Sequence, residues 1–112
     1  MTGVPKKILQ IIVEDCDRLG DHALDEAIVR FLQKSGIAGA TVTTGSMGYG
    51  ANRRIHRKGL FGVSDEKPVV ISAIDSEENL RAVLPKLLAM IPEGIVFLQD
   101  AEVFVRVQSK TE

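Results

Sequence analysis

Residues 45–50, with the sequence GSMGYG, combine three glycines with polar and aromatic side chains. Glycine permits positive φ angles, so successive backbone N–H groups in such a turn can surround an anion. Four basic residues follow within residues 53–58, and arginine binds phosphate oxygens through paired hydrogen bonds. The ring of Tyr49 can stack on a nucleobase. These residue types predict an anion-binding loop with the candidate residues Gly45, Ser46, Met47, Gly48, Tyr49, Gly50, Arg53, Arg54, His56 and Arg57.

A plainer interpretation of the same loop stays open. Its charges can simply be solvated, and its glycines can serve only to turn the chain. The lysine-serine ending of a P-loop and the strand-to-helix context of a dinucleotide fold are both missing from this sequence. His56 suits phosphate contact or pH sensing, and equally a solvent-facing position.

Catalytic and metal-binding residues are not predicted. Ser46 has no evident base to activate it as a nucleophile. His22 lies near Asp15, Cys16 and Asp17, which are ligand types for a metal, but no pair among them has helical or hairpin ligand spacing. The single cysteine excludes an internal disulfide, so the fold depends on packing. Because no catalytic or metal-ligand pattern is found, we expect no cofactor.

Composition indicates an ordinary globular chain. It has 112 residues, 45% of them hydrophobic and 26% charged, which fits one domain over residues 1–112. No apolar run approaches the roughly 20 residues that cross a bilayer, and acidic residues stand where a signal peptide would be cleaved, so we expect a cytoplasmic protein. The net charge is −1, yet residues 46–67 carry five basic and two acidic residues. This asymmetry favours an anionic partner at the loop over a nucleic-acid surface.

Hydrophobic patterning predicts two helices. Apolar residues at helical spacing follow Asp21, a candidate N-cap, and the pattern stops at Gly36. A second helix follows the cap residue Ser76, with its apolar face at Leu80, Val83, Leu84, Leu87, Leu88 and Ile91.

Four strands are predicted around these helices. Short β-branched or alternating apolar segments occupy residues 6–13, 39–45, 68–75 and 95–107, the last as one broken or two short strands, and residues 108–112 form a frayed tail. The order is β-α-β-β-α-β, which predicts an α+β, ferredoxin-like fold: a four-stranded antiparallel sheet with both helices on one face. The other face would expose apolar side chains, so we expect homo-oligomerisation. Residues 46–67 form an unusually long connection between the second and third strands.

The sequence resembles domain-of-unknown-function family 190, a group within the PII-like signalling superfamily. The resemblance runs from the first strand through the fourth, and its most specific parts are residues 39–42 (GATV), 48–50 (GYG), 55–56 (IH), 68–70 (PVV) and 93–94 (EG). It implies a ferredoxin-like homotrimer with residues 46–67 as the T-loop. It also implies ligand clefts between neighbouring subunits, where PII proteins hold adenine nucleotides or related effectors.

Individual positions follow from the resemblance. Gly45, Ser46 and Met47 match the base of the T-loop, Pro92, Glu93 and Gly94 match the short loop before the last strand, and Arg106 falls in the C-terminal strand. Nucleotide-binding PII proteins place a lysine directly after the glycine of that short loop, whereas this chain has Ile95. This difference argues against triphosphate binding in the PII manner and leaves a smaller adenylyl ligand, a cyclic dinucleotide or a carboxylate.

The resemblance implies a regulatory, nucleotide-binding protein in signal transduction and not an enzyme. Its T-loop would signal to a target protein such as a membrane transporter. An alternative is an enzyme acting on acyl or phosphoryl groups, because acylphosphatases share this topology, but residues 14–17 (EDCD) follow the first strand where such an enzyme needs a phosphate-binding arginine. RNA recognition is disfavoured because residues 6–13 and 68–75 contain no aromatic side chain for stacking.

Overall fold

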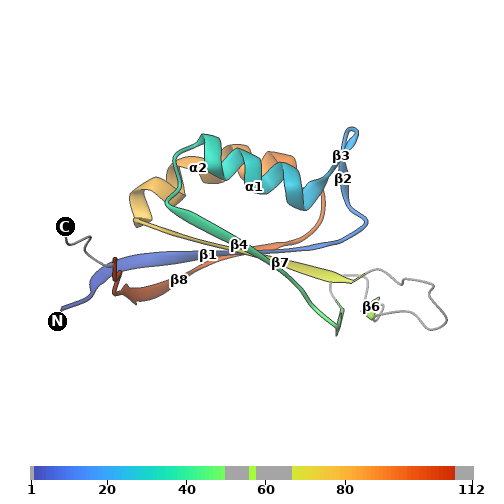
Figure 1. The fold of residues 1–112 in the computed structure, drawn as a ribbon. Coiled ribbons are helices and arrows are strands. Elements are labelled where there is room, and N and C mark those ends of the chain that lie inside the picture. Colours follow the sequence, from blue (N-terminus) through green and yellow to red (C-terminus); the bar gives the residue numbers. More distant parts are fainter. Residues whose placement is uncertain (1, 50–55, 58–66, 108–112) are drawn as a thin grey trace, which may run out of the picture.

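One four-stranded antiparallel sheet and two helices form the body of the protein (Figure 1). The computed structural model describes residues 2–49, 56–57 and 67–107. The sheet order is β4-β7-β1-β8. The long elements are β1 (Val4–Glu14), α1 (Leu24–Lys34), β4 (Gly39–Thr44), β7 (Pro68–Asp75), α2 (Glu77–Met90) and β8 (Ile95–Val103), and two-residue strands pair as β2 (Arg18–Leu19) with β3 (His22–Ala23) and β5 (Met47–Gly48) with β6 (His56–Arg57). Neither helix in the described ranges is long and apolar enough to span a membrane.

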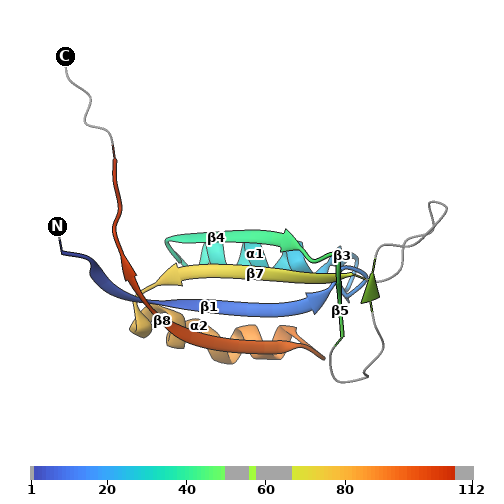
Figure 2. The ribbon, with the colours of Figure 1, turned by 90° about the horizontal axis from the view of Figure 1, so that it is seen from below.

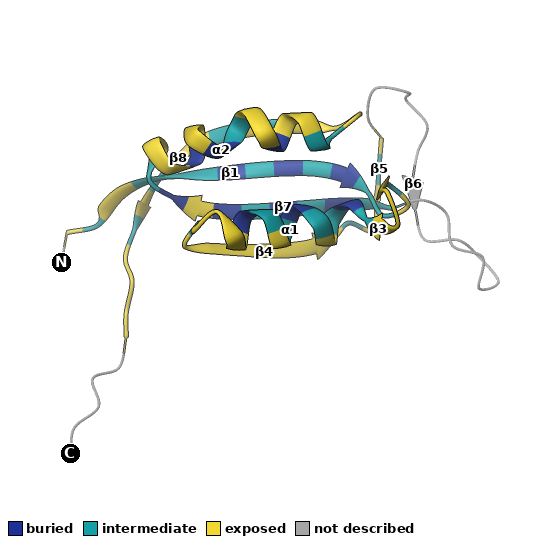
Figure 3. Cartoon of the chain, turned by 90° about the horizontal axis from the view of Figure 1, so that it is seen from above, coloured by how far each residue is buried: buried dark blue, intermediate teal, exposed yellow. Residues whose placement is uncertain are grey.

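Both helices pack on the same face of the sheet, and the core lies between the two layers (Figures 1 and 3). Alternate residues of each strand point to opposite faces. The helix-covered face of β1 carries Leu9, Ile11 and Val13, all essentially inaccessible to solvent. The core is completed by apolar residues of β7 and of both helices, namely Val69, Ile71, Ala73, Leu24, Ile28, Leu32, Leu80, Val83 and Leu87.

The opposite face of the sheet, here called the outer face, is covered by neither of the two helices of the described residues (Figures 1 and 2). Strand register places its side chains in cross-strand rows; one row contains Val70, Ile12 and Ile95. The next row is polar at its centre, where the Ser72 hydroxyl donates to Oε1 of Gln10 over 2.5 Å. The outer face therefore carries apolar side chains around a small hydrogen-bonded polar centre.

The start of α1 corrects the sequence-based expectation. Asp21 does not cap the helix: α1 begins at Leu24, and its N-cap residue Ala23 offers no side-chain hydrogen bond. Asp21 instead lies in the turn of the β2–β3 hairpin beside Gly20, whose φ of 60° is easily reached by glycine. The Leu24 amide donates to the Asp17 carbonyl over 2.9 Å, so backbone contacts replace a capping side chain. The predicted stop at Gly36, with φ of 81°, is confirmed.

The start of α2 agrees with the sequence, because the Asn79 amide donates to the Ser76 hydroxyl over 3.1 Å. The neighbouring carboxylate of Asp75 is buried and accepts hydrogen bonds from the Ser76 amide, the Asn79 side chain and the Ala38 amide at 2.6, 2.9 and 2.8 Å. Burial by itself raises the pKa of Asp75, but these hydrogen bonds outweigh it and hold the pKa below its ordinary value. Asp75 thus joins the end of β7 to α2 and to the segment before β4.

The last strand is continuous and shorter than expected. β8 runs from Ile95 to Val103, where it pairs with Val4. The apolar alternation continues through Val107, but β1 offers no further partner, so the ladder ends. Arg106, predicted to lie in a strand, is instead an exposed residue beyond β8.

Candidate functional site

The base of the connection between β4 and β7 is held by backbone contacts. The Gly45 amide donates to the Pro68 carbonyl over 2.7 Å. A Cβ on Gly45 would lie 2.8 Å from Cγ of Pro68, so only glycine fits there without displacement. On the far side, Asp15 and Lys67 are joined twice: the Asp15 amide donates to the Lys67 carbonyl over 2.9 Å, and the Lys67 amide donates to Oδ1 of Asp15 over 3.1 Å. Both ends of the connection are therefore anchored to the sheet.

The first residues of this connection are accessible. Ser46 is exposed, and the side chains of Met47 and Tyr49 are 59% and 69% exposed. In the β5–β6 pair, Met47 lies opposite Arg57 and Gly48 lies opposite His56. The structure thus places the backbone of seven of the ten predicted loop residues at the end of the sheet. Gly50, Arg53 and Arg54 lie outside the described residues, as do the side chains of His56 and Arg57.

A second turn, residues 92–94, stands at the same end of the sheet. Pro92, Glu93 and Gly94 are all exposed. A Cβ on Gly94 would lie 2.7 Å from the carbonyl oxygen of Ile12 and 3.1 Å from Cγ1 of its neighbour, so the turn packs directly on the end of β1. Ile95, which follows, is 51% exposed. This turn offers backbone groups, one carboxylate and an apolar side chain, but no cation.

The two turns leave the sheet from opposite edges. Gly45 follows β4 at one edge, and residues 92–94 precede β8 at the other edge, while β5 (Met47–Gly48) runs across the end of the sheet (Figure 2). β7 and β1 lie between β4 and β8, and three strand spacings amount to about 14 Å. Sequence reasoning predicted both turns but could not place them on opposite edges, because this depends on the strand order.

Arg106 is separate from both turns. β8 begins at the end of the sheet that carries them and runs away from it, so Arg106 lies beyond the far end (Figure 2). Nine residues of strand span about 30 Å. Within one chain Arg106 therefore lies far from both turns, and its assignment to a cleft between subunits stays a prediction.

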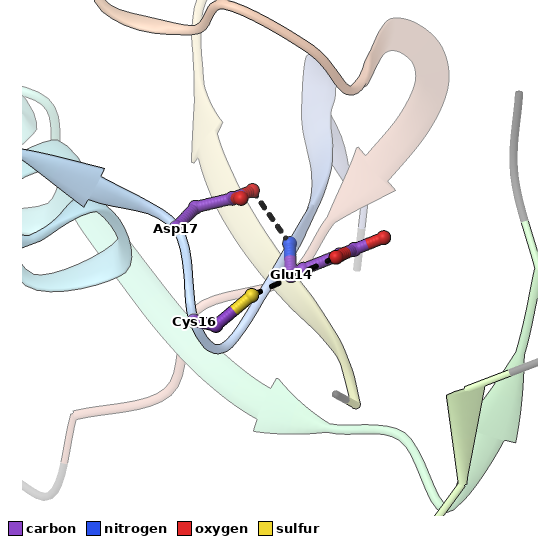
Figure 4. A group of neighbouring side chains, drawn as sticks. All are labelled: Glu14, Cys16 and Asp17. Atoms are coloured by element: carbon purple, nitrogen blue, oxygen red, sulfur yellow. Dashed lines mark hydrogen bonds between the residues drawn. The ribbon is translucent and has the colours of Figure 1, made fainter. Parts of the chain in front are cut away.

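The turn after β1 contains the ligand types considered for a metal (Figure 4). Ligand atoms of Glu14, Cys16 and Asp17 lie within 4.8 Å of one another, and His22 is not among them. Hydrogen bonds within the turn engage these groups: the Glu14 amide donates to Oδ2 of Asp17 over 2.9 Å, and the Cys16 thiol lies 3.7 Å from Oε2 of Glu14. We assign this group to the turn's own structure.

An open groove of about 560 Å³ lies at the opposite end of the sheet, away from both turns. Within it the Lys7 ammonium pairs with Asp100 and lies 3.9 Å from the Glu77 carboxylate. The hydrogen bond to Asp100 raises the pKa of Lys7, and the same contact lowers the pKa of Asp100. Because the lysine is already paired and none of the predicted site residues that the structure describes lines this groove, we do not place the ligand site there.

Solved structures with this fold define the class of protein. The chain is similar to CPII, a nitrogen regulatory PII-like protein from Thiomonas intermedia K12 whose structure contains ADP, AMP and bicarbonate. The identity is 26%, 89% of each chain is covered, and the TM-score is 0.62. The divalent ion tolerance protein CutA1 from Ehrlichia chaffeensis, with 14% identity, 90% and 83% coverage and a TM-score of 0.59, shares the fold alone. The architecture is that of PII-like proteins.

The chain belongs to the DUF190 family, described as an uncharacterized ACR, whose model matches residues 6–103. A UPF0166 protein from Methanocaldococcus jannaschii is 35% identical over 102 residues, covering 90% of this chain and 94% of that protein. A UPF0166 protein from Aquifex aeolicus is 29% identical over 103 residues, covering 92% and 97%. The family resemblance inferred from residues 39–42, 48–50, 55–56, 68–70 and 93–94 is thereby confirmed.

Proposed function

We propose that this protein is a PII-like regulator that binds an adenylyl anion in clefts between the subunits of a ferredoxin-like homotrimer. Residues 46–67 act as its T-loop, which transmits ligand occupancy to a target protein such as a membrane transporter. The protein works by binding and not by catalysis. The observation that carries the proposal is the pair of exposed, glycine-dependent turns at one end of the sheet, in a fold shared with a nucleotide-bound PII-like protein.

The chemistry of the turns favours a ligand with little phosphate charge. Exposed backbone amides and the loop's basic residues suit a carboxylate or a monophosphate. Ile95 stands where nucleotide-binding PII proteins carry a lysine, so additional phosphates lose the cationic partner that this lysine would supply. We therefore expect AMP or ADP to bind more tightly than ATP.

Isothermal titration calorimetry with AMP, ADP and ATP tests this ranking, alongside thermal-shift measurements with cyclic dinucleotides and bicarbonate. A ligand at 100 times its Kd stabilises the native state by about 2.7 kcal/mol, which moves the Tm of a domain this size by several degrees. Absence of binding by every one of these ligands would contradict the proposal.

The variant Ile95→Lys sharpens the test. A lysine there supplies a charge-assisted hydrogen bond worth about 1.5–3 kcal/mol, so ATP affinity should rise about 10- to 100-fold while AMP affinity changes little. The matched control Ile95→Met keeps the size without the charge. A similar gain with methionine would show that the effect is not electrostatic.

The basic loop is tested by replacing Arg53, Arg54 and Arg57 together with alanine. Anion affinity should fall about tenfold or more, since each arginine can offer paired charge-assisted hydrogen bonds. Unfolding in urea should be unchanged, because the core residues all lie outside the loop. Unchanged ligand affinity would assign these arginines to the target protein instead.

A further inference from the structure

A second groove, of about 330 Å³, lies on the helix layer. Residues of α1 supply most of its lining, and the β2–β3 hairpin and the last residue of α2 supply the rest. The hairpin projects beside the start of α1 (Figure 1). The volume falls at the lower end of the range of small-molecule sites, roughly 300–1,000 Å³. None of residues 45–49 and 92–94 lines this groove, so it is separate from the two turns.

Four apolar side chains from three elements form the floor of the groove. Ala27 and Phe31 lie one turn apart on α1, Met90 ends α2, and Leu19 belongs to β2. Phe31 and Met90 pack against the core without being fully buried, and Leu19 is 38% exposed. Apolar groups that converge from separate elements and stay accessible in a groove are typical of a binding site for an apolar ligand.

Hydrogen bonds hold the hairpin in place beside the groove. The Arg18 guanidinium donates to the carbonyl oxygen of Asp21 across the turn. At the base of the hairpin, the Leu24 amide donates to the Asp17 carbonyl over 2.9 Å. None of residues 18–23 belongs to the buried core. The side chain of Leu19 is therefore available to a ligand without a loss of core packing.

The charges around the floor favour an anion. Glu26 is the one carboxylate in the described lining, and the Arg30 guanidinium binds it over 2.9 Å, so these two charges compensate each other. The other polar groups of the lining are His22 and Lys34, and Lys34 has no acidic partner among the described residues. A lysine lays its aliphatic stem along apolar surface and keeps its ammonium in water. The groove thus combines an apolar floor with an uncompensated cation.

We propose that this groove binds a carboxylate with a single apolar chain, such as a medium-chain fatty acid. The chain lies on Phe31 and Met90, and the carboxylate pairs with Lys34. At 1.5 Å per residue, Glu26 and Lys34 are about 12 Å apart along α1, a length that a medium acyl chain spans. The site does not depend on the proposed adenylyl site. A second copy is not its occupant, because we expect copies to associate through the outer face, on the other side of the sheet.

A chain-length series on the wild-type protein tests the apolar floor. Isothermal titration calorimetry compares octanoate with decanoate, both kept below the concentrations at which they form micelles. Decanoate carries two more methylenes and should bind more tightly, by up to about 15-fold if both are buried. Octanol, which has a chain of the same length without the charge, should bind more weakly than octanoate. AMP should not displace decanoate.

Two variants with matched controls test the residues. Leu19→Ser removes apolar surface from the groove and should weaken decanoate binding severalfold, whereas Leu88→Ser, at a leucine that is 52% exposed outside the groove, should bind like the wild type. Lys34→Gln should weaken octanoate binding about two- to fivefold and leave octanol binding unchanged. Lys86→Gln, at an exposed lysine of α2 outside the groove, is its control. Far-ultraviolet circular dichroism verifies folding.

Several outcomes would overturn the proposal. These are an absence of carboxylate binding, equal affinity for octanoate and decanoate, or equal effects in the variants and their controls. Displacement of decanoate by AMP would assign the carboxylate to the nucleotide site instead. If every carboxylate fails but an acidic amphipathic peptide binds and Leu19→Ser weakens it, the groove is a protein-docking site. Failure of AMP to bind, with carboxylate binding intact, would refute the proposed function alone.

Discussion

The two faces of the sheet are built from the same strands, but their side chains differ in how deeply they are buried. On β7, Ile71 points under the helices and is inaccessible, while Ile74, three residues later, points outward and is 39% exposed. The helix-covered face is complete within one chain. The outer face exposes apolar side chains around the Gln10–Ser72 hydrogen bond, which suits contact with another copy. The comparison teaches that the fold depends on one side of each strand and leaves the other side available for contact.

The largest effect should come from truncating the helix-covered face. Ile71→Ala removes a fully buried side chain and leaves a cavity, so it should lower the free energy of unfolding by about 2–5 kcal/mol. Ile74→Ala, the matched change on the outer face, should cost the monomer less than about 1 kcal/mol and instead promote dissociation on dilution. Urea unfolding measures the free energy of unfolding, and light scattering measures dissociation. Equal losses of stability in the two variants would show that both faces contribute equally to the fold.

Asp75→Asn should come next. The carboxylate accepts three hydrogen bonds. The NH₂ group of an asparagine would face at least one of the same N–H donors and could not accept its hydrogen bond, so the free energy of unfolding should fall by about 2 kcal/mol. Because the folded pKa is lowered, the stability that Asp75 contributes is fully present above the unfolded value of about 3.9 and is lost as pH falls through the folded pKa. The stability gap between wild type and variant, measured by urea unfolding, should narrow only below about pH 4. A gap that narrows near neutral pH would indicate another group.

Ser76→Ala should have a smaller effect. It removes the acceptor for the Asn79 amide at the start of α2, which typically costs about 1 kcal/mol. Ser76→Asp is the control, because it keeps an acceptor and adds a favourable charge at the helix N-terminus. In thermal unfolding, the wild type and Ser76→Asp should have similar Tm values, both higher than the Tm of Ser76→Ala.

The smallest change in monomer stability should follow Gln10→Leu on the outer face. Its partner Ser72 remains partly exposed and can bond to water, so the free energy of unfolding should change by less than about 0.5 kcal/mol. Association between copies should change more than monomer stability does, because a polar pair within an apolar interface restricts how the two partners can align. If the free energy of unfolding of the monomer fell by more than about 1 kcal/mol, the outer face would also stabilise the fold.

The sequence predicted the elements whose signal is local and periodic. The strand over residues 68–75 and the cap at Ser76 are confirmed, because alternation and capping chemistry depend only on neighbouring residues. The β2–β3 hairpin was missed, since two-residue strands have no period to detect, and Asp21 was therefore misread as a helix cap. The strand predicted through Val107 stops at Val103 because β1 provides no partner beyond Val4.

The candidate site was predicted in parts but not as an arrangement. Gly45 and Gly94 were identified from the sequence, and both fit positions where a side chain would clash with the backbone or with Pro68. Their placement on opposite edges follows from strand order, which no local pattern encodes. Arg106 was grouped with them by resemblance, and within one chain it lies at the far end of the sheet. Assigning the loop's arginines requires the binding measurements described above.

The central strand β1 has a consequence for how the chain folds. Its residues pair only with β7 and β8, whose partners lie from about 55 to about 100 positions later in the chain. During synthesis the first strand must therefore wait, unpaired, until β7 and then β8 have left the ribosome. Such long-range pairing slows folding compared with helical domains of equal size. The core residues of β1 thus spend the longest time exposed, and co-translational chaperone contact should concentrate on this strand.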